Sequence, residues 1–166
     1  FSLTSLTKLQ GESGISGKGF DNAQILLYYS IIIRKRKKEM GYLNGGVFRS
    51  TDPWIHGERC IDSNELIYVI DGTVFLEEDG VCYTLSRGDI LVLEGGKRHR
   101  GTAPSVGVEF YWFHFNGPFP VKELHAADSR FSVLIRQLFH YENNPTFPRR
   151  TLELMLELIF IELKVA

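Results

Sequence analysis

Short apolar segments separated by turn residues run from position 42 to 115, and this pattern predicts a series of short β-strands. The expected strands are rich in β-branched and aromatic residues and span 65–71, 73–78, 81–85, 90–93 and 106–115. Asp79-Gly80 is a strong hairpin signal between two of them. The polar stretch 94–101 (EGGKRHRG) is expected to be a loop. Strands at this spacing predict an all-β sandwich or barrel.

The hydrophobic period changes after Pro118 and Pro120 to that of helices. One helix is predicted over roughly 126–142 and a second over roughly 149–165, with a break at Asn143-Asn144-Pro145. The second helix is apolar nearly all round, so it needs cover on more than one side. We expect the barrel on one face and a second copy of the chain on the other, with Leu156 and Ile159 among the outward positions.

Residues 1–39 differ from the rest, with a Ser- and Gly-rich start, an apolar run at 25–33 and a basic cluster at 34–38. Three interpretations stay open: an added N-terminal strand with a charged turn, a nucleic-acid patch, or translated upstream sequence with the natural start at Met40. The third follows from RKRKKE before a Met, since purine-only codons can encode all these residues. Deleting 1–39 tests it, because loss of folding or dimerisation would contradict it.

Bulk composition excludes several classes of protein. With 43% hydrophobic and 23% charged residues, the 166-residue chain is not typical of a disordered one. Its net charge of −1 does not indicate a nucleic-acid surface. The apolar run at 25–33 is too short to cross a bilayer, so we expect no membrane partner. Two cysteines, Cys60 and Cys82, favour free thiols and a cytoplasmic location.

Two stretches resemble the paired motifs of the cupin superfamily. Glu65 and Gly72 have the spacing that ends the first motif. Gly88, the 94–96 segment and His99 fit the second, with a Glu where that motif has Pro. The resemblance implies a double-stranded β-helix, or jelly-roll barrel.

A finer resemblance is to the N-terminal domain of AraC-family transcription regulators. It covers about 42–166 and is carried by Trp54, Arg59, ELIYVIDG, GDILVLEGGKRHRG, FYWFHF and the helical pair. The family implies a cupin barrel over 40–120 that binds a small effector, often a sugar, and a dimerising helical hairpin over 121–166. In the family a domain with two helix-turn-helix units follows. The chain ends before such a domain, so we expect DNA contact only through a missing part.

A metal centre is not expected from the motifs. Metal-binding cupins carry two His before the first-motif Glu, and the corresponding positions, 58–61 (ERCI), hold none. Glu65 and His99 alone are too few ligands for a stable transition-metal site. His56 is a conceivable third ligand, but its spacing does not match the motif. We therefore expect no metal, no cofactor and no catalytic residue.

The expected ligand-binding residues are Arg59, Glu65, His99, Trp112 and His114. Side chains alternate across a strand, so Phe110, Trp112 and His114 share one face, which the resemblance directs into the barrel. An aromatic ring beside polar groups suits a sugar. Competing interpretations stay open: Trp112 as plain core, His114 as a satisfied interior histidine, and Arg59 as a surface ion-pair partner.

The sequence is compatible with three functions. The first is an effector-binding module, not an enzyme, that passes its signal through dimer contacts to a DNA-binding domain. The second is a cupin enzyme, such as a sugar isomerase or dioxygenase, with a degenerate metal site. The third is a dimerising domain without an effector. The first is the function we predict.

Overall fold

The computed structural model describes residues 40–125, 127 and 129–166, so the interpretations of 1–39 lie outside the described residues. Within the described part, strands come first and two helices follow. The strands are β1 (Gly41–Ser50), β2 (Arg59–Cys60), β3 (Asn64–Asp71), β4 (Thr73–Glu78), β5 (Val81–Ser86), β6 (Ile90–Leu93), β7 (Arg98–Gly101), β8 (Val108–Asn116) and β9 (Glu123–Leu124). The helices are α3 (Arg130–Glu142) and α4 (Arg150–Val165).

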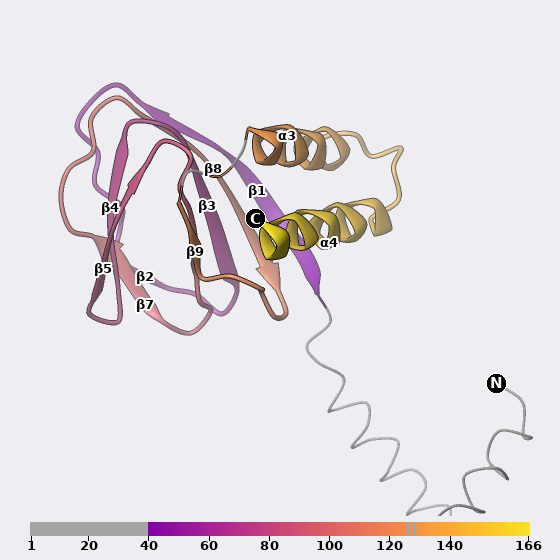
Figure 1. Ribbon diagram of the computed structural model, residues 1–166, viewed down its shortest axis with the longest axis horizontal. Helices are drawn as coiled ribbons and strands as arrows, with labels where there is room; N and C mark the ends of the chain where they lie inside the picture. Colours follow the sequence, from indigo (N-terminus) through magenta and orange to yellow (C-terminus); the bar gives the residue numbers. More distant parts are fainter. Residues whose placement is uncertain (1–39, 126, 128) are drawn as a thin grey trace, which may run out of the picture. The chain divides into compact units, whose positions relative to one another are not determined.

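The strands form two antiparallel sheets that face each other (Figure 1). One sheet has the order β1-β8-β3-β6-β9 and the other β2-β7-β4-β5. The chain passes repeatedly from one sheet to the other, since β3, β6 and β8 belong to the first while the β4–β5 hairpin and β7 belong to the second. This arrangement is the expected cupin-type jelly-roll barrel followed by two helices, and the predicted fold class is confirmed.

Alternation along the strands of the five-stranded sheet produces two separate hydrophobic cores. Inward residues of both sheets form the barrel core: Ile67, Val69, Val74, Leu76, Leu85, Leu91, Leu93, Val108 and Phe110. The opposite face of the five-stranded sheet packs on the helices through Tyr42, Leu66, Tyr68, Ile90, Val92, Tyr111, Phe113 and Phe115. The sheet is therefore buried on both faces, which explains why β3 and β6 read as nearly continuous apolar runs.

Both helices lie on the side of the barrel formed by β1, β3 and β8, away from β4 and β5 (Figure 1). The helix predicted from residue 126 begins at Arg130. Ala127 stays outside it, because its N–H donates to the carbonyl of Gly88 on the barrel, 2.8 Å away.

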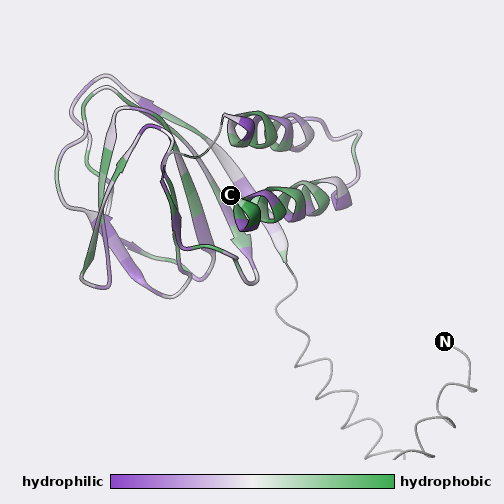
Figure 2. Cartoon of the chain, viewed as in Figure 1, coloured by the Kyte–Doolittle hydropathy of each residue, from purple (hydrophilic) through white to green (hydrophobic). Residues whose placement is uncertain are grey.

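The prediction that Leu156 and Ile159 point outward is wrong, since both are fully buried. They pack with Phe160 and Leu163 of α4 in the core shared with the sheet and α3. The exposed apolar positions of α4 are Leu154, Leu158, Ile161 and Val165. A helix that is hydrophobic along most of its length, as Figure 2 shows for α4, does not reveal from sequence which side meets its own domain.

The prediction of a loop over 94–101 is wrong in its second half, because Arg98–Gly101 forms β7. Arg98 and Arg100 face solvent and His99 faces inward, so the strand alternates correctly. Its single inward residue within this charged run is a histidine and not an apolar residue. The pattern therefore lacks the hydrophobic positions by which a strand is recognised.

The glycines of the two predicted motifs mark turns that need unusual backbone angles. Gly72, after β3, has φ of 76°, and a Cβ there would lie 2.5 Å from the carbonyl oxygen of Gly107. Gly96, before β7, has φ of 85°. These are conformations that other residues adopt at a cost, so the motif spacing reflects the two turns that lead out of β3 and into β7.

Two further observations concern the cysteines and the length of the helices. Cys60 and Cys82 are free and exposed. Neither helix in the described part of the chain is long and apolar enough to span a membrane.

Candidate ligand-binding site

Polar side chains from both sheets meet at one level of the barrel interior. Glu65 on β3 is paired with His114 on β8, so the two side chains lie on the same inner face. In the opposite sheet, His99 on β7 is paired with Arg59 on β2 and with Glu78 on β4. The next inward pair along the five-stranded sheet, Ile67 and Trp112, starts the apolar core below.

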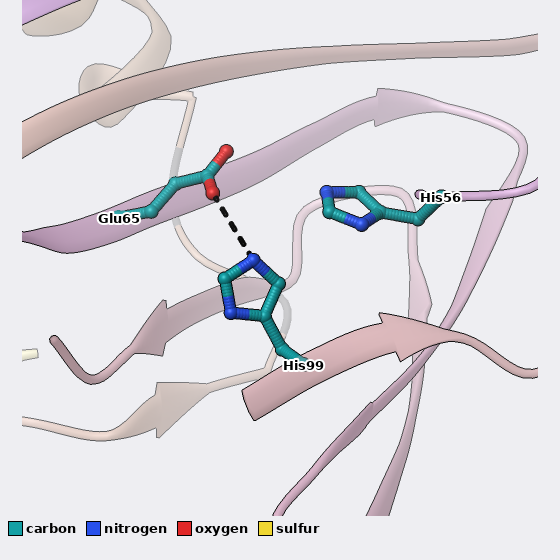
Figure 3. Close-up of side chains that lie close together, drawn as sticks. All are labelled: His56, Glu65 and His99. Atoms are coloured by element: carbon teal, nitrogen blue, oxygen red, sulfur yellow. Dashed lines mark ion pairs between the residues drawn. The ribbon is translucent and has the colours of Figure 1, made fainter. Parts of the chain in front are cut away.

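Glu65 and His99 face each other across the barrel (Figure 3). Their nearest atoms, Oε2 and Nε2, are 3.9 Å apart, which is too long for a hydrogen bond. Both side chains are buried, with 3% and 1% of their surface exposed. Glu65 Oε2 and both ring nitrogens of His99 have no hydrogen-bond partner among the described residues. A contact with the Lys97 backbone acts to raise the pKa of His99. This contact does not have the geometry of a hydrogen bond.

His56, in the connection between β1 and β2, is the third member of this cluster. Its ring lies 5.4 Å from that of His99, and donor atoms of His56, Glu65 and His99 all lie within 4.8 Å of one another. The structure therefore brings His56 beside Glu65 and His99, although its spacing does not match the motif. Motif spacing counts residues along the chain, whereas His56 reaches the interior because its carbonyl accepts the Gly101 N–H at the end of β7.

Burial controls the protonation of these groups. Desolvation raises the pKa of Glu65 to about 7, although the nearby Arg59 charge opposes the shift. Desolvation lowers the pKa of His56 to about 4, and it also lowers the pKa values of His99 and His114, assisted by Arg59. The three imidazoles are therefore neutral near pH 7, and each presents one nitrogen lone pair to the interior or to its neighbours.

Trp112 and His114 lie side by side on β8, with ring centroids 5.4 Å apart and planes at 68°. Both are half-buried, unlike the fully buried Phe113 and Phe115 on the other face of the strand. The Nδ1 atom of His114 is 3.2 Å from the Ser63 hydroxyl. The predicted inward direction of the Trp112 face is confirmed, since Trp112 packs against the barrel core.

Arg59 is exposed at this level of the barrel, and its side chain makes no ion pair or hydrogen bond with a described residue. Its charge nevertheless influences the pKa of Glu65 and of three histidines. The guanidinium is thus close to the cluster and free to meet a polar ligand.

Hydrogen bonds of Glu78 and Asn64 hold the segments around the cluster in place. Glu78, beside His99, accepts hydrogen bonds from the Glu94 backbone N–H at 2.5 Å and from the Lys122 ammonium. Asn64, beside Glu65, accepts from the Gly95 N–H at 2.9 Å and donates to the Gly117 carbonyl at 2.9 Å. These bonds connect β3 and β4 to the segment at 94–95. They therefore restrict the movement of the strands that carry the inner side chains.

The structure brings all five predicted ligand-binding residues to one region of the barrel. Sequence reasoning missed Ser63 and Glu78 and dismissed His56. Ser63 and Glu78 precede or end predicted strands, and nothing in their local pattern distinguishes them from surface residues.

The fold and this inner site define a cupin-type barrel that carries aromatic, imidazole and carboxylate groups in its interior. Residues 46–159 match the model of the AraC-like ligand binding domain. The chain belongs to this family, which confirms the resemblance stated from its motifs.

Individual proteins match only part of the chain. The chain is 32% identical over 72 residues to YisR of Bacillus subtilis (strain 168), an uncharacterized HTH-type transcriptional regulator. That match covers 43% of the chain and 24% of the relative's length. Similar solved structures include the Clostridium difficile EutQ protein (21% identity, 45% of this chain, 57% of that chain, TM-score 0.37). Another is an RmlC-like cupin from Shewanella frigidimarina (18% identity, 46% and 67%, TM-score 0.39).

Proposed function

We propose that the chain is the effector-sensing and dimerisation part of a transcription regulator, and that its barrel binds a small polar metabolite, a mono- or disaccharide. The observation that carries the proposal is the half-buried Trp112 ring, which shares an inner face with His114 and Glu65. Membership of a ligand-binding family supports binding as the role of this site and not catalysis.

A sugar matches the chemistry of this interior. Its C–H face packs on an aromatic ring, and its hydroxyls both donate and accept hydrogen bonds. Arg59 supplies donors, and Glu65, His99 and His114 supply polar atoms around the same space. The buried atoms of Glu65 and His99 that lack partners gain them when a polar ligand enters, which favours the bound state.

The exposed face of α4 supports dimerisation. Leu154, Leu158, Ile161 and Val165 are spaced by four, three and four residues, and their exposed fractions are 51, 40, 59 and 76%. This spacing is that of a coiled-coil seam. We propose that two copies pair along the α4 seam, defined as these four residues, with two-fold symmetry.

DNA contact is proposed for a segment outside this chain. The net charge of −1 provides no excess of positive charge for binding phosphates. The relative from Bacillus subtilis is named as an HTH-type regulator and is about four times as long as the matched segment.

Thermal unfolding in the presence of a panel of sugars tests effector binding. A ligand at one hundred times its Kd stabilises the folded state by about 2.7 kcal/mol. For a chain of this size, the melting temperature should rise by roughly 5–10 °C. Trp112→Ala should abolish the rise, because it removes the stacking surface. Phe147→Ala, which shortens an exposed aromatic residue outside the barrel, should keep it.

Two outcomes would contradict this assignment. If Trp112→Ala unfolds the protein, the ring is a core residue and the site is wrong. If a rise persists in Trp112→Ala, the ligand binds elsewhere. A rise with another class of metabolite and none with sugars would keep the site and overturn the choice of ligand.

A further inference from the structure

Three metal-ligating side chains converge inside the barrel from three separate segments. His56 comes from the connection after β1, Glu65 from β3 and His99 from β7 (Figure 3). All three are buried, and one donor atom of each lies within 4.8 Å of the others. We propose that these three side chains bind a divalent transition-metal ion.

Buried polar atoms of this cluster lack partners among the described residues. Glu65 Oε2 and both nitrogens of His99 are buried without a hydrogen-bond partner in the described part of the chain, and burial without a partner destabilises polar atoms. The converging atoms, two imidazole nitrogens and one carboxylate oxygen, can all offer lone pairs. A single water molecule has two hydrogens to give to three acceptors. One cation is complementary to all three atoms.

The orientation of the His56 ring suits a metal ligand. Its Nδ1 lies 2.8 Å from the carbonyl oxygen of Gly57. A carbonyl oxygen only accepts, so Nδ1 carries the hydrogen and Nε2 is left with a lone pair. A backbone carbonyl that fixes the ring in this tautomer is the usual outer contact of a metal-bound histidine.

The donor set selects the class of ion. Two imidazoles and one carboxylate bind Zn²⁺ in hydrolytic sites and Fe²⁺ in non-haem sites. Ca²⁺ and Mg²⁺ prefer oxygen ligands alone and are not expected. Two donors on one such ion are at most about 4.2 Å apart, so binding requires a small rotation of the side chains, while Glu65 and His99 are already at 3.9 Å.

This donor set differs from the cupin motif. The motif places two histidines just before the first-motif Glu, where this chain has Arg59 and Ile61 or Glu58 and Cys60. His56 lies further back and reaches the site from a different segment. Three protein ligands leave a fourth position for water or for an effector oxygen. The inference does not rest on the proposed effector, because ion binding is measured without it.

Titration of the full chain with Co²⁺, after removal of metals with a chelator, tests the proposal. We expect one equivalent to bind, with visible absorption bands and a raised melting temperature, and Zn²⁺ to displace it. His56→Asn, Glu65→Gln and His99→Asn should each weaken binding at least about 100-fold, since changing even an outer contact costs 10- to 100-fold. His140→Asn removes an exposed imidazole on α3 and should bind as the unmodified chain does.

Far-ultraviolet circular dichroism in the absence of metal confirms folding, and the isosteric Glu65→Gln decides if a histidine variant fails to fold. Less than about one tenth of an equivalent bound at saturating Co²⁺ would overturn the proposal, because three intact ligands hold such ions firmly. Unchanged binding by Glu65→Gln would also overturn it. Loss in His114→Asn with retention in His56→Asn would overturn the assignment of the third ligand.

Discussion

At the scale of single residues, the wall beside the site contains a partly buried ion pair. Glu78 is 3% exposed, lies beside His99, and its outer carboxylate oxygen is paired with the Lys122 ammonium. Lys122 is itself 30% exposed, so solvent weakens this pair somewhat. The pair nevertheless keeps a carboxylate inside the wall of the barrel.

We expect Lys122→Met to destabilise the protein by about 2–3 kcal/mol, because it leaves the Glu78 carboxylate buried with one remaining partner. Urea unfolding measures the change. Glu77→Gln, which breaks the exposed pair with Arg100, is the control and should alter stability little. Equal midpoints for Lys122→Met and the unmodified chain would show that the pair contributes nothing.

Sequence and structure agree at residue scale where strand alternation applies. The inward positions of Glu65, Trp112 and His114 follow from a period of two and from motif register. The position of His56 does not, because it lies in an irregular segment whose path depends on hydrogen bonding to β7. The sequence pattern around His56 does not predict such a contact, because it forms only in the folded barrel.

At the scale of elements, the helical hairpin is attached to the barrel through β1. The Tyr42 hydroxyl donates to the Glu142 carboxylate at 2.6 Å, and its carbonyl accepts from the Arg149 guanidinium at 2.7 Å. Burial, and then Glu142, raise the pKa of Tyr42, so the hydroxyl stays protonated as the donor. One strand residue therefore contacts the end of α3 and the residue that precedes α4.

Tyr42→Phe should lower the free energy of unfolding by about 1–2 kcal/mol, since a hydrogen bond to a charged group is lost while the ring still packs. Tyr141→Phe serves as the matched control, because the Tyr141 hydroxyl makes no hydrogen bond within the described residues. Chemical denaturation of both variants gives the comparison. An equal loss in both would mean that the hairpin is held by packing alone.

The two faces of α4 should respond differently to a charge. Leu158→Glu, on the α4 seam, is expected to produce folded monomers, because it places a carboxylate in the proposed contact between copies. Leu156→Glu should unfold the protein, since Leu156 is fully buried in its own domain. Light scattering and circular dichroism separate these outcomes. A monomer before any substitution would contradict dimerisation through α4.

The sequence predicts well those strands and helices in which hydrophobic residues recur at a regular spacing. The strands β3 to β6 and the helix α4 agree with their predicted ranges to within one residue. β7 was missed because its inward residue is His99, and the buried face of α4 was misjudged because the helix is apolar on several sides. Polar interiors and doubly covered helices are both cases in which tertiary contacts override the local pattern.

At the scale of the whole molecule, one sheet serves two cores. Alternate residues of β8 face the barrel interior at Trp112 and the helices at Phe113, so the proposed ligand site and the proposed dimer helices share a strand. The family match extends from residue 46 in β1 to residue 159 in α4, and therefore includes both. Under the proposed function, this shared strand is the structural connection between the ligand site and the hairpin.

The barrel interior between Trp112 and His99 is the proposed ligand-binding site. A crystal structure of the protein with the compound that gives the largest thermal shift tests it most directly. We predict ligand density against the Trp112 ring, with polar contacts to Arg59, Glu65, His99 or His114. Density at the groove between the barrel and α3, lined by Arg87 and Ser132, with the barrel interior unchanged, would contradict the account.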